Sequence, residues 1–309
     1  MTIMEIPAAA APVRTPSTVW PLARIEAKRY ARHPLFLTGL FFALLFSAGE
    51  HGPIELDYHV IPSFFIGVFG IIVGYRLTTS TRKSRPVIDA SPVSRTMQTA
   101  ALCMACVVPA GAGLLVVLMH RMFVLADPFP ERFYGTYGTV DRFLIAIVVP
   151  AIACAGGPLL GVAVGRWLRF PGAALLTVVV VLVWGNISGY LPTEKWQSDS
   201  FGARLLHMAG PYTAFASSNA DANLDPTVVH SFTGSPFWYA VWTLALCGLA
   251  AAAAMWRGAE GLARRRVGRA FVVIGTVALV ALALSVVTGN QHLYDTTEHG
   301  TVVSNGWTV

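Results

Sequence analysis

Apolar residues are gathered along the chain into seven long runs, which are separated by shorter polar segments. A helix that crosses a bilayer needs roughly 20 mostly apolar residues. The runs are Leu35–Ala48, His59–Tyr75, Gln98–Met119, Phe143–Gly165, Phe170–Leu191, Pro236–Trp256 and Ala270–Gly289. We therefore predict an all-α, polytopic integral membrane protein with about seven transmembrane helices, of which the first is the shortest.

The composition agrees with this pattern and excludes other classes of protein. Of the 309 residues, 55% are hydrophobic and only 12% are charged, whereas a soluble globular domain carries about 25% charged residues. The apolar content is also too high for a disordered chain. Four cysteines are too few for a scaffold built on disulfides.

Basic residues are unevenly distributed over the segments between the predicted helices, and this distribution predicts the orientation of the chain. One alternate set of segments, residues 1–34, 76–97, 166–169 and 257–269, holds 17 of the 22 Lys and Arg residues. Because cytoplasmic loops are enriched in Lys and Arg, we expect a cell-membrane protein with a cytoplasmic N-terminus and an extracytoplasmic C-terminus. The net charge of +6 then reflects topology, and no nucleic-acid partner is expected.

Groups that carry out chemistry are scarce. The seven predicted helices contain no Asp, Glu, Lys or Arg, although ion-coupled transporters and intramembrane enzymes place such groups within the membrane. The chain has no P-loop, G-x-S-x-G or H-E-x-x-H motif. We therefore expect no catalytic residue and no cofactor on this chain, and an energy source has to come from another chain.

Cysteines and histidines are the remaining candidates for a metal site. Cys103 and Cys106 form a C-x-x-C pair inside a predicted helix, and we interpret them as packing residues. Seven of the eight histidines, His120 and His207 among them, lie at or beyond the predicted outer face. Their spacing matches no metal-ligand pattern, so we interpret them as scattered surface residues and expect no bound metal.

Glycines recur at four-residue spacing in three of the predicted helices, which lets helix backbones approach closely. They are Gly70 and Gly74, then Gly157, Gly161 and Gly165, and then Gly185 and Gly189. Packing within one bundle and contact between two copies both explain such a stripe. The fifth predicted helix is the better candidate for a dimer seam, because Asn186 can hydrogen-bond across an interface or meet a substrate.

A basic amphipathic helix is predicted over Ser17–His33, before the first span. Its basic residues recur at helical spacing, and Trp20 adds an apolar contact for the membrane surface. The residues of this predicted surface helix are Trp20, Arg24, Lys28, Arg29 and Arg32. The alternative is a cytosolic flank that merely follows the charge rule.

The longest predicted cytoplasmic connection, residues 76–97, holds a short apolar piece between two prolines. Val87, Ile88 and Asp89 lie in this piece, and Arg85 flanks it. A short helix at this position suits contact with a soluble partner, and a solvated loop is the alternative. In the longest outer segment, Phe201–Phe215 is expected to form one or two short helices at the outer leaflet.

In this order, these parts resemble the membrane subunit of a type-2 ATP-binding-cassette exporter. The pattern W-x-x-x-R-x-E-x-x-R at Trp20–Arg29 and the sequence A-S-P-V-S-R at Ala90–Arg95 resemble actinobacterial permeases in particular. The resemblance covers about residues 17–256 and implies a permease core with an elbow helix and six spans. Residues 1–16 are then a flexible tail, and residues 257–309 add a seventh span and an outer tail, which the family core lacks.

The resemblance also implies partners. A separate nucleotide-binding subunit would bind ATP and Mg and dock on the connection at Arg85, Val87, Ile88 and Asp89. A second permease copy or a paralogue would complete the pathway among membrane lipids. The candidate residues for the pathway or dimer seam are Phe69, Trp184, Gly185, Asn186 and Gly189.

Two functions from different classes follow from these observations. The first is export of a hydrophobic or amphiphilic substrate, such as a lipid, drug or peptide, because the predicted spans carry no charge. The second is a non-transporting membrane anchor or sensor, whose outer segments bind a ligand or a protein.

Overall fold

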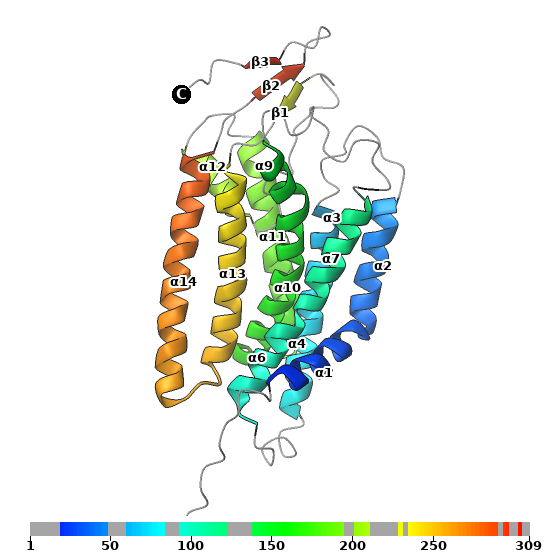
Figure 1. The fold of residues 1–309 in the computed structure, drawn as a ribbon, viewed down its shortest axis with the longest axis vertical. Coiled ribbons are helices and arrows are strands. Elements are labelled where there is room, and N and C mark those ends of the chain that lie inside the picture. The colour runs from blue at the N-terminus through cyan, green and yellow to red at the C-terminus, as the bar shows by residue number, and fades with distance from the viewer. Residues whose placement is uncertain are drawn as a thin grey trace, which may run out of the picture.

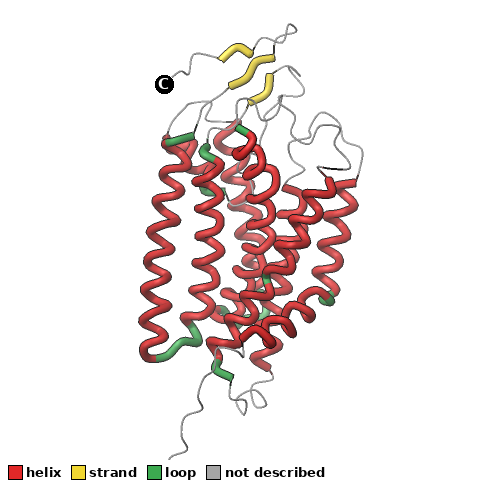
Figure 2. Tube along the Cα trace, in the orientation of Figure 1, coloured by secondary structure: helices red, strands yellow, loops and turns green. Residues whose placement is uncertain are grey.

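The computed structural model describes residues 19–48, 60–83, 93–120, 122, 138–194, 201–210, 228–230, 234–289, 293–296 and 302–304. In this part of the chain, long helices stand side by side in one elongated bundle, and a small sheet lies beyond one end (Figure 1). The tube view shows the same division between helices and strands (Figure 2).

The helical elements are α1 (Val19–Ala31), α2 (Pro34–Ala48), α3 (Val60–Pro62), α4 (Val68–Lys83), α6 (Arg95–Ala105), α7 (Val107–Met119), α9 (Thr139–Phe143), α10 (Val149–Trp167), α11 (Ala173–Glu194), α12 (Phe201–Met208), α13 (Pro236–Trp256) and α14 (Gly261–Val287). Two wider π-helical segments are η3 (Ser63–Gly67) and η5 (Leu144–Val148). The strands are β1 (Val228–His230), β2 (Leu293–Thr296) and β3 (Val302–Ser304).

Five helices among the described residues are long and apolar enough to cross a membrane, and the bent pair α1–α2 raises this number to six. The five are Ser63–Thr81, Arg95–Met119, Thr139–Trp167, Pro236–Trp256 and Gly261–Val287. α11 contributes a shorter apolar stretch, Ala173–Ser188. The chain is therefore a helical protein with several membrane-span-like helices, as the sequence predicts, and the count of seven stays a prediction.

Hydrogen bonds between distant segments gather the basic segments at one end of the bundle, which we call the basic end. The Arg29 guanidinium in α1 donates to Ser80 Oγ in α4 at 3.1 Å. Thr96 Oγ1 in α6 donates to the carbonyl of Gly258, between α13 and α14, at 3.0 Å. The Tyr75 hydroxyl donates to the carbonyl of a residue between α10 and α11 at 2.9 Å. The four segments predicted to share one side of the membrane thus meet at one end.

The other helix ends meet at the level next to the strands, which we call the sheet end. His120 Nδ1, after α7, lies 2.7 Å from the Ser47 carbonyl in α2. The Ser235 amide, before α13, donates to the Ser285 carbonyl in α14 at 2.9 Å. The helices therefore run between two levels, as membrane spans must.

Helices α4 and α10 pack with their backbones in contact. A Cβ atom on Gly157 would collide with the backbone of Gly67, and one on Gly161 would collide with the Ile71 carbonyl. From the other side, a Cβ atom on Gly74 would collide with the carbonyl of Pro158. The glycine stripes of these two helices are thus explained by packing within one bundle, because only glycine permits so close an approach.

Prolines and π-helical segments occur together in the same two helices. η3 follows Pro62 directly, and η5 ends two residues before Pro150 in α10. A proline has no amide hydrogen to complete the α-helical pattern, and a wider turn is one way to accommodate this loss. η3 packs against the first turn of α10, where Ser63 Oγ donates to the Pro150 carbonyl at 3.4 Å.

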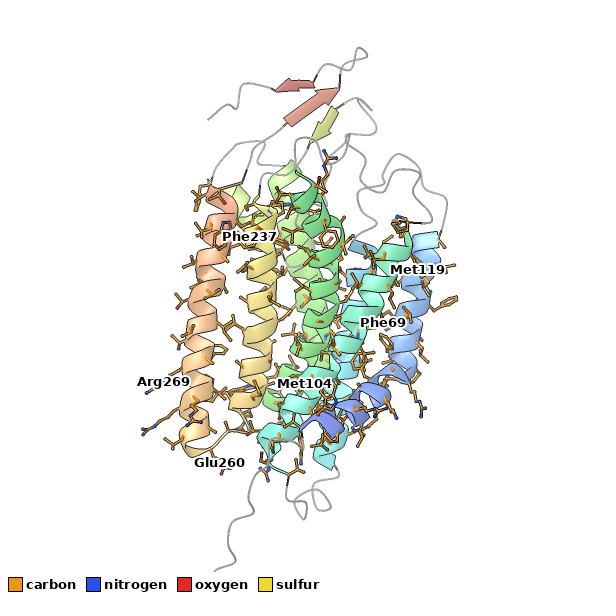
Figure 3. All side chains as sticks on the ribbon, viewed as in Figure 1. Phe69, Met104, Met119, Phe237, Glu260 and Arg269 are labelled. Carbon is orange, nitrogen blue, oxygen red and sulfur yellow. The ribbon has the colours of Figure 1, made fainter. Side chains whose placement is uncertain are left out.

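The last long helix starts earlier than predicted. The sequence suggests a span over Ala270–Gly289, whereas α14 runs over Gly261–Val287. Arginine favours helix and its long side chain can reach water from a helix end, so the charged residues mark the membrane boundary and not the helix boundary. In Figure 3, Glu260 lies at the turn before α14 and Arg269 projects away from the bundle. The exposed arginines of these first turns are Arg264, Arg265, Arg266 and Arg269.

A small antiparallel sheet adds to the predicted all-α architecture. β1 pairs with β2 and β2 with β3, with Val229 opposite Tyr294 and Asp295 opposite Val303. Valine and tyrosine favour strands, but runs this short are weak signals in a sequence. The sheet joins the segment before α13 to the tail after α14 (Figure 1).

Gly157→Ala and Gly156→Ala are a matched pair that tests the close contact between α10 and the end of η3, directly before α4. A methyl group on Gly157 must displace the Gly67 backbone, whereas one on Gly156 meets only Cys247 Sγ, at 3.4 Å. Overpacking costs about 1–3 kcal/mol, while alanine in place of a helical glycine with room gains about 0.5–1 kcal/mol. We expect the Tm in detergent to fall for Gly157→Ala only. An equal Tm for both variants would contradict the close packing of the two helices.

Candidate functional site

The predicted docking residues Arg85, Val87, Ile88 and Asp89 lie outside the described residues, and their role stays a prediction. The flanks of their segment are described. Ser80, near the end of α4, is bonded to Arg29 of α1, and α6 packs alongside α1. The two helices that flank the segment thus both contact α1.

The predicted basic amphipathic helix is present as α1. It is bent by 61° from α2, and its opposite face buries Ala23 and Tyr30. Arg29 also pairs with Glu26 at 2.8 Å. The whole predicted set is exposed: Trp20, Arg24, Lys28 and Arg29 lie in α1, and Arg32 follows its last residue. The helix is amphipathic because one face buries Ala23 and Tyr30 and the other carries the exposed basic side chains. Its place on a membrane surface stays a prediction.

Two of the predicted pathway residues make contacts within the chain. Phe69 in α4 lies against Gly39 of α2, whose Cβ position would be 3.1 Å from Phe69 Cβ. Asn186 is exposed on α11, and its Nδ2 donates to the Leu182 carbonyl of the same helix at 2.8 Å. Phe69 thus contacts α2, whereas Asn186 is bonded within its own helix, α11.

The other predicted seam residues lie on α11 near the sheet end. Trp184 Nε1 donates to the Ala209 carbonyl after α12 at 3.0 Å. Gly185 is buried within the chain, and Gly189 lies in the following turn of the helix. The contact between two copies that this stripe suggests stays a prediction.

Two of the histidines interpreted as surface residues are buried, and that interpretation is wrong for them. His120 is 3% exposed and His207 is 2% exposed. His207 in α12 has Nδ1 3.1 Å from the Ser188 carbonyl in α11, and burial lowers its pKa to about 4. These histidines hold helix ends together at the sheet end. Local sequence pattern does not indicate this burial, because His207 is covered where α12 packs on α11 and α14, and His120 contacts α2.

All four cysteines are free thiols, and three of them are buried. Cys106 Sγ donates to the Leu102 carbonyl at 3.5 Å, and Cys247 Sγ donates to the Ile152 carbonyl at 3.6 Å. These contacts agree with a packing role. Within the described part of the chain, no three or more His, Cys, Asp and Glu side chains lie close enough together to hold a metal ion.

A hollow between α10, α11 and α13 is a candidate site among the described residues, and we call it the α10–α13 groove. Its volume is about 370 Å³, within the usual range of ligand sites, about 300–1,000 Å³. Gly156 and Leu160 of α10, Val181 of α11, Ala250 of α13 and Phe271 of α14 are among its lining residues. The groove is open along one side, and its depth follows from the small side chains of α10 and α13.

The α10–α13 groove offers almost no hydrogen-bonding group to a ligand. Two of its lining residues, Thr243 and Cys247, carry polar atoms on their side chains. Thr243 Oγ1 donates to the Tyr239 carbonyl of its own helix at 3.1 Å, and Cys247 Sγ donates to Ile152. A ligand in this groove is therefore held by apolar contact along its length.

Towards the basic end, the α10–α13 groove meets two tryptophans and an arginine. The carbonyl of Ala253, a lining residue, accepts a hydrogen bond from Trp167 Nε1 at 2.9 Å. The Arg257 guanidinium carbon lies 5.7 Å from the centre of the Trp167 ring. Trp256 lies 5.7 Å, ring centre to ring centre, from Phe271, another lining residue. The groove thus has an aromatic and cationic border at this end.

Sequence reasoning did not identify the α10–α13 groove. The available signal was the concentration of small residues on two helices, Gly156 and Gly157 on α10 and the run Ala250–Ala254 on α13. Such residues also suit close helix packing, and Gly157 is used in that way.

No protein-family model, curated protein or solved structure matches the chain.

The buried His207 predicts that stability falls with pH below about 6.5. In the unfolded chain a histidine takes up a proton near pH 6.5, whereas the folded protein resists protonation until about pH 4. Between these values the unfolded state binds more protons, so lowering the pH favours unfolding. At pH 5.5 the loss is about 1 kcal/mol, or roughly 2–4 °C in Tm.

The measurement is the Tm in detergent between pH 7.5 and 5, for the natural chain and for His207→Asn, which keeps a polar atom near the position of Nδ1. We expect a lower Tm for the variant at pH 7.5 and a flatter dependence on pH. Parallel curves for the two proteins would exclude His207 as the titrating group.

Proposed function

We propose that the chain is the transmembrane subunit of an ATP-binding-cassette exporter, which moves a hydrophobic or amphiphilic substrate such as a lipid, drug or peptide out of the cytoplasm. The observation that carries this proposal is the meeting of three elements at the basic end. α1 lies across the base of the bundle (Figure 1), is bonded to α4 and packs on α6. The segment with Val87, Ile88 and Asp89 connects α4 and α6 along the chain, and both of these helices contact the basic helix α1. In this proposal a soluble ATPase docks on that segment.

The orientation and the span count belong to the same proposal. With the basic end in the cytoplasm, the charge rule is satisfied, the N-terminus is inside, and the C-terminus lies outside the cell membrane. α1 is then an elbow helix on the membrane surface, with Trp20 and the basic side chains of α1 facing the interface. α2 and α11 are counted as spans beside the five long apolar helices, which gives seven.

Energy is supplied by a partner in this proposal. The predicted spans hold no Asp, Glu, Lys or Arg, so proton or ion coupling through the membrane lacks its usual groups. A nucleotide-binding subunit with ATP and Mg would do the work, and a second permease copy or a paralogue would pair with this chain. Because α4 and α10 use their glycine stripes internally, α11 with Trp184 and Asn186 is the proposed seam.

A second candidate function is a non-transporting anchor or sensor. The sheet β1–β3 favours it, because the sheet ties together two segments at the sheet end. A folded unit outside the membrane suits the binding of a ligand or a protein.

Purification with a bound ATPase tests the exporter proposal. The tagged chain is isolated in mild detergent with native lipids retained, and the eluate is analysed by mass spectrometry and for ATP hydrolysis. We expect one P-loop ATPase in stoichiometric amount, and its recovery should fall at least tenfold for Val87→Asp and for Ile88→Asp. A tenfold loss corresponds to about 1.4 kcal/mol of binding, a modest value for a charge placed in an apolar contact.

Val140→Asp is the matched control, since Val140 is 72% exposed and lies in α9 at the sheet end. It makes the same substitution far from the docking segment and should leave ATPase recovery unchanged. If the natural chain carries no ATPase at all, the exporter proposal fails and the anchor or sensor gains support.

A further inference from the structure

We propose that the α10–α13 groove binds one acyl chain of an anionic phospholipid from the surrounding bilayer, with the lipid phosphate at the basic end beside Arg257. The inference goes beyond the proposed function and does not depend on it, because a lipid site of this kind suits an exporter, an anchor or a sensor. Length, chemistry and charge each contribute to the argument.

The length of the α10–α13 groove matches one leaflet of a bilayer. Its lining residues on α13 extend from Thr243 to Ala253, and ten residues of helix span about 15 Å. The hydrocarbon core of a bilayer is about 30 Å thick, so an acyl chain from one leaflet extends over half of it. A chain that starts at the basic end therefore fills the groove along its length.

The walls of the α10–α13 groove select an apolar occupant. Its polar side chains, Thr243 and Cys247, already donate to backbone carbonyls. A polar cargo would lose its hydrogen bonds with water here and gain none, which is costly. A hydrocarbon chain loses nothing and gains contact with Leu160, Val181 and Phe271.

The basic end supplies a site for the headgroup. Trp167 is 49% exposed, and exposed tryptophans settle at the level of lipid headgroups. Arg257 is exposed and lies over the Trp167 ring. In the part of the chain that the structure describes, no carboxylate lies within ion-pair distance of Arg257. The guanidinium is therefore available to a phosphate at the depth where one is found.

The first turns of α14 extend the same positive field. They present exposed arginines and follow Arg257 closely along the chain. The positive charge complements an anionic headgroup and gives no advantage to a zwitterionic one. This is why the proposed lipid is anionic and not simply any phospholipid.

The test measures lipid binding to the purified full-length chain by native mass spectrometry. The probes are palmitoyl-oleoyl phosphatidylglycerol and palmitoyl-oleoyl phosphatidylcholine, which share acyl chains and differ in headgroup charge. We expect one tightly held lipid per chain and at least a tenfold preference for phosphatidylglycerol. Equal binding of the two lipids would overturn the anionic assignment.

Two variants fill the α10–α13 groove from opposite walls, Gly156→Leu from α10 and Ala250→Leu from α13. Each should lower the bound fraction of both lipids at least tenfold, and two variants guard against one that does not fold. Gly111→Leu is the control, because no atom lies within 4 Å of a Cβ built on Gly111 in α7. Normal lipid binding by a folded Gly156→Leu or Ala250→Leu would overturn the proposal.

Arg257→Gln tests the headgroup separately. It should lower the preference for phosphatidylglycerol at least threefold while leaving the acyl chain bound, because the arginines of α14 remain. Arg24→Gln, which changes an exposed arginine on α1, should keep the full preference. A preference unchanged by Arg257→Gln would place the headgroup elsewhere and overturn that part of the proposal. Because the assay needs neither ATPase nor transport, its failure leaves the exporter proposal standing, and a chain without an ATPase can still bind the lipid.

Discussion

The backbone contact between α4 and α10 is the interaction on which the rest of the bundle depends. Gly157 and Gly161 meet carbonyls of the facing segment directly, so dispersion contacts replace the hydrophobic effect that a bilayer cannot supply between helices. α4 in turn holds α1 through Ser80. α10 provides the surface on which α7, α11 and α13 pack. The central helix pair thus determines where both ends of the bundle find their partners.

The α10–α13 groove arises because α10 has to serve two neighbours with small residues. Gly157 admits the backbone that precedes α4, while the adjacent Gly156 faces Cys247 with room to spare. Small side chains on α13 do not fill the space that α10 leaves. The adjacent glycines of α10 therefore leave room on two neighbouring sides of the helix, one for the facing backbone and one for the groove. The groove is lined by hydrocarbon and by two polar groups whose hydrogen bonds are satisfied.

Much of the fold can be predicted from the sequence, because a bilayer imposes length and polarity on each helix. The run Pro236–Trp256 is a helix with those same bounds, and the basic segments share one end. The predicted start of the last span differs from the start of α14. Charged residues indicate where a helix leaves the membrane, whereas arginine does not end a helix. Burial of His120 and His207 and the α10–α13 groove depend on contacts between segments far apart in sequence. Local pattern carries no information about such contacts.

The separation of the two partners in the central pair has a consequence for biosynthesis. Gly67 and Gly157 are 90 residues apart, and ribosomes add about 5–20 residues per second. The second predicted span therefore waits roughly 5–20 s for α10 after its own synthesis. During that interval the backbone that will face α10 has no permanent partner, and lipid or the insertion machinery has to cover it. The central contact of the bundle therefore cannot form before the fourth predicted span has been synthesised.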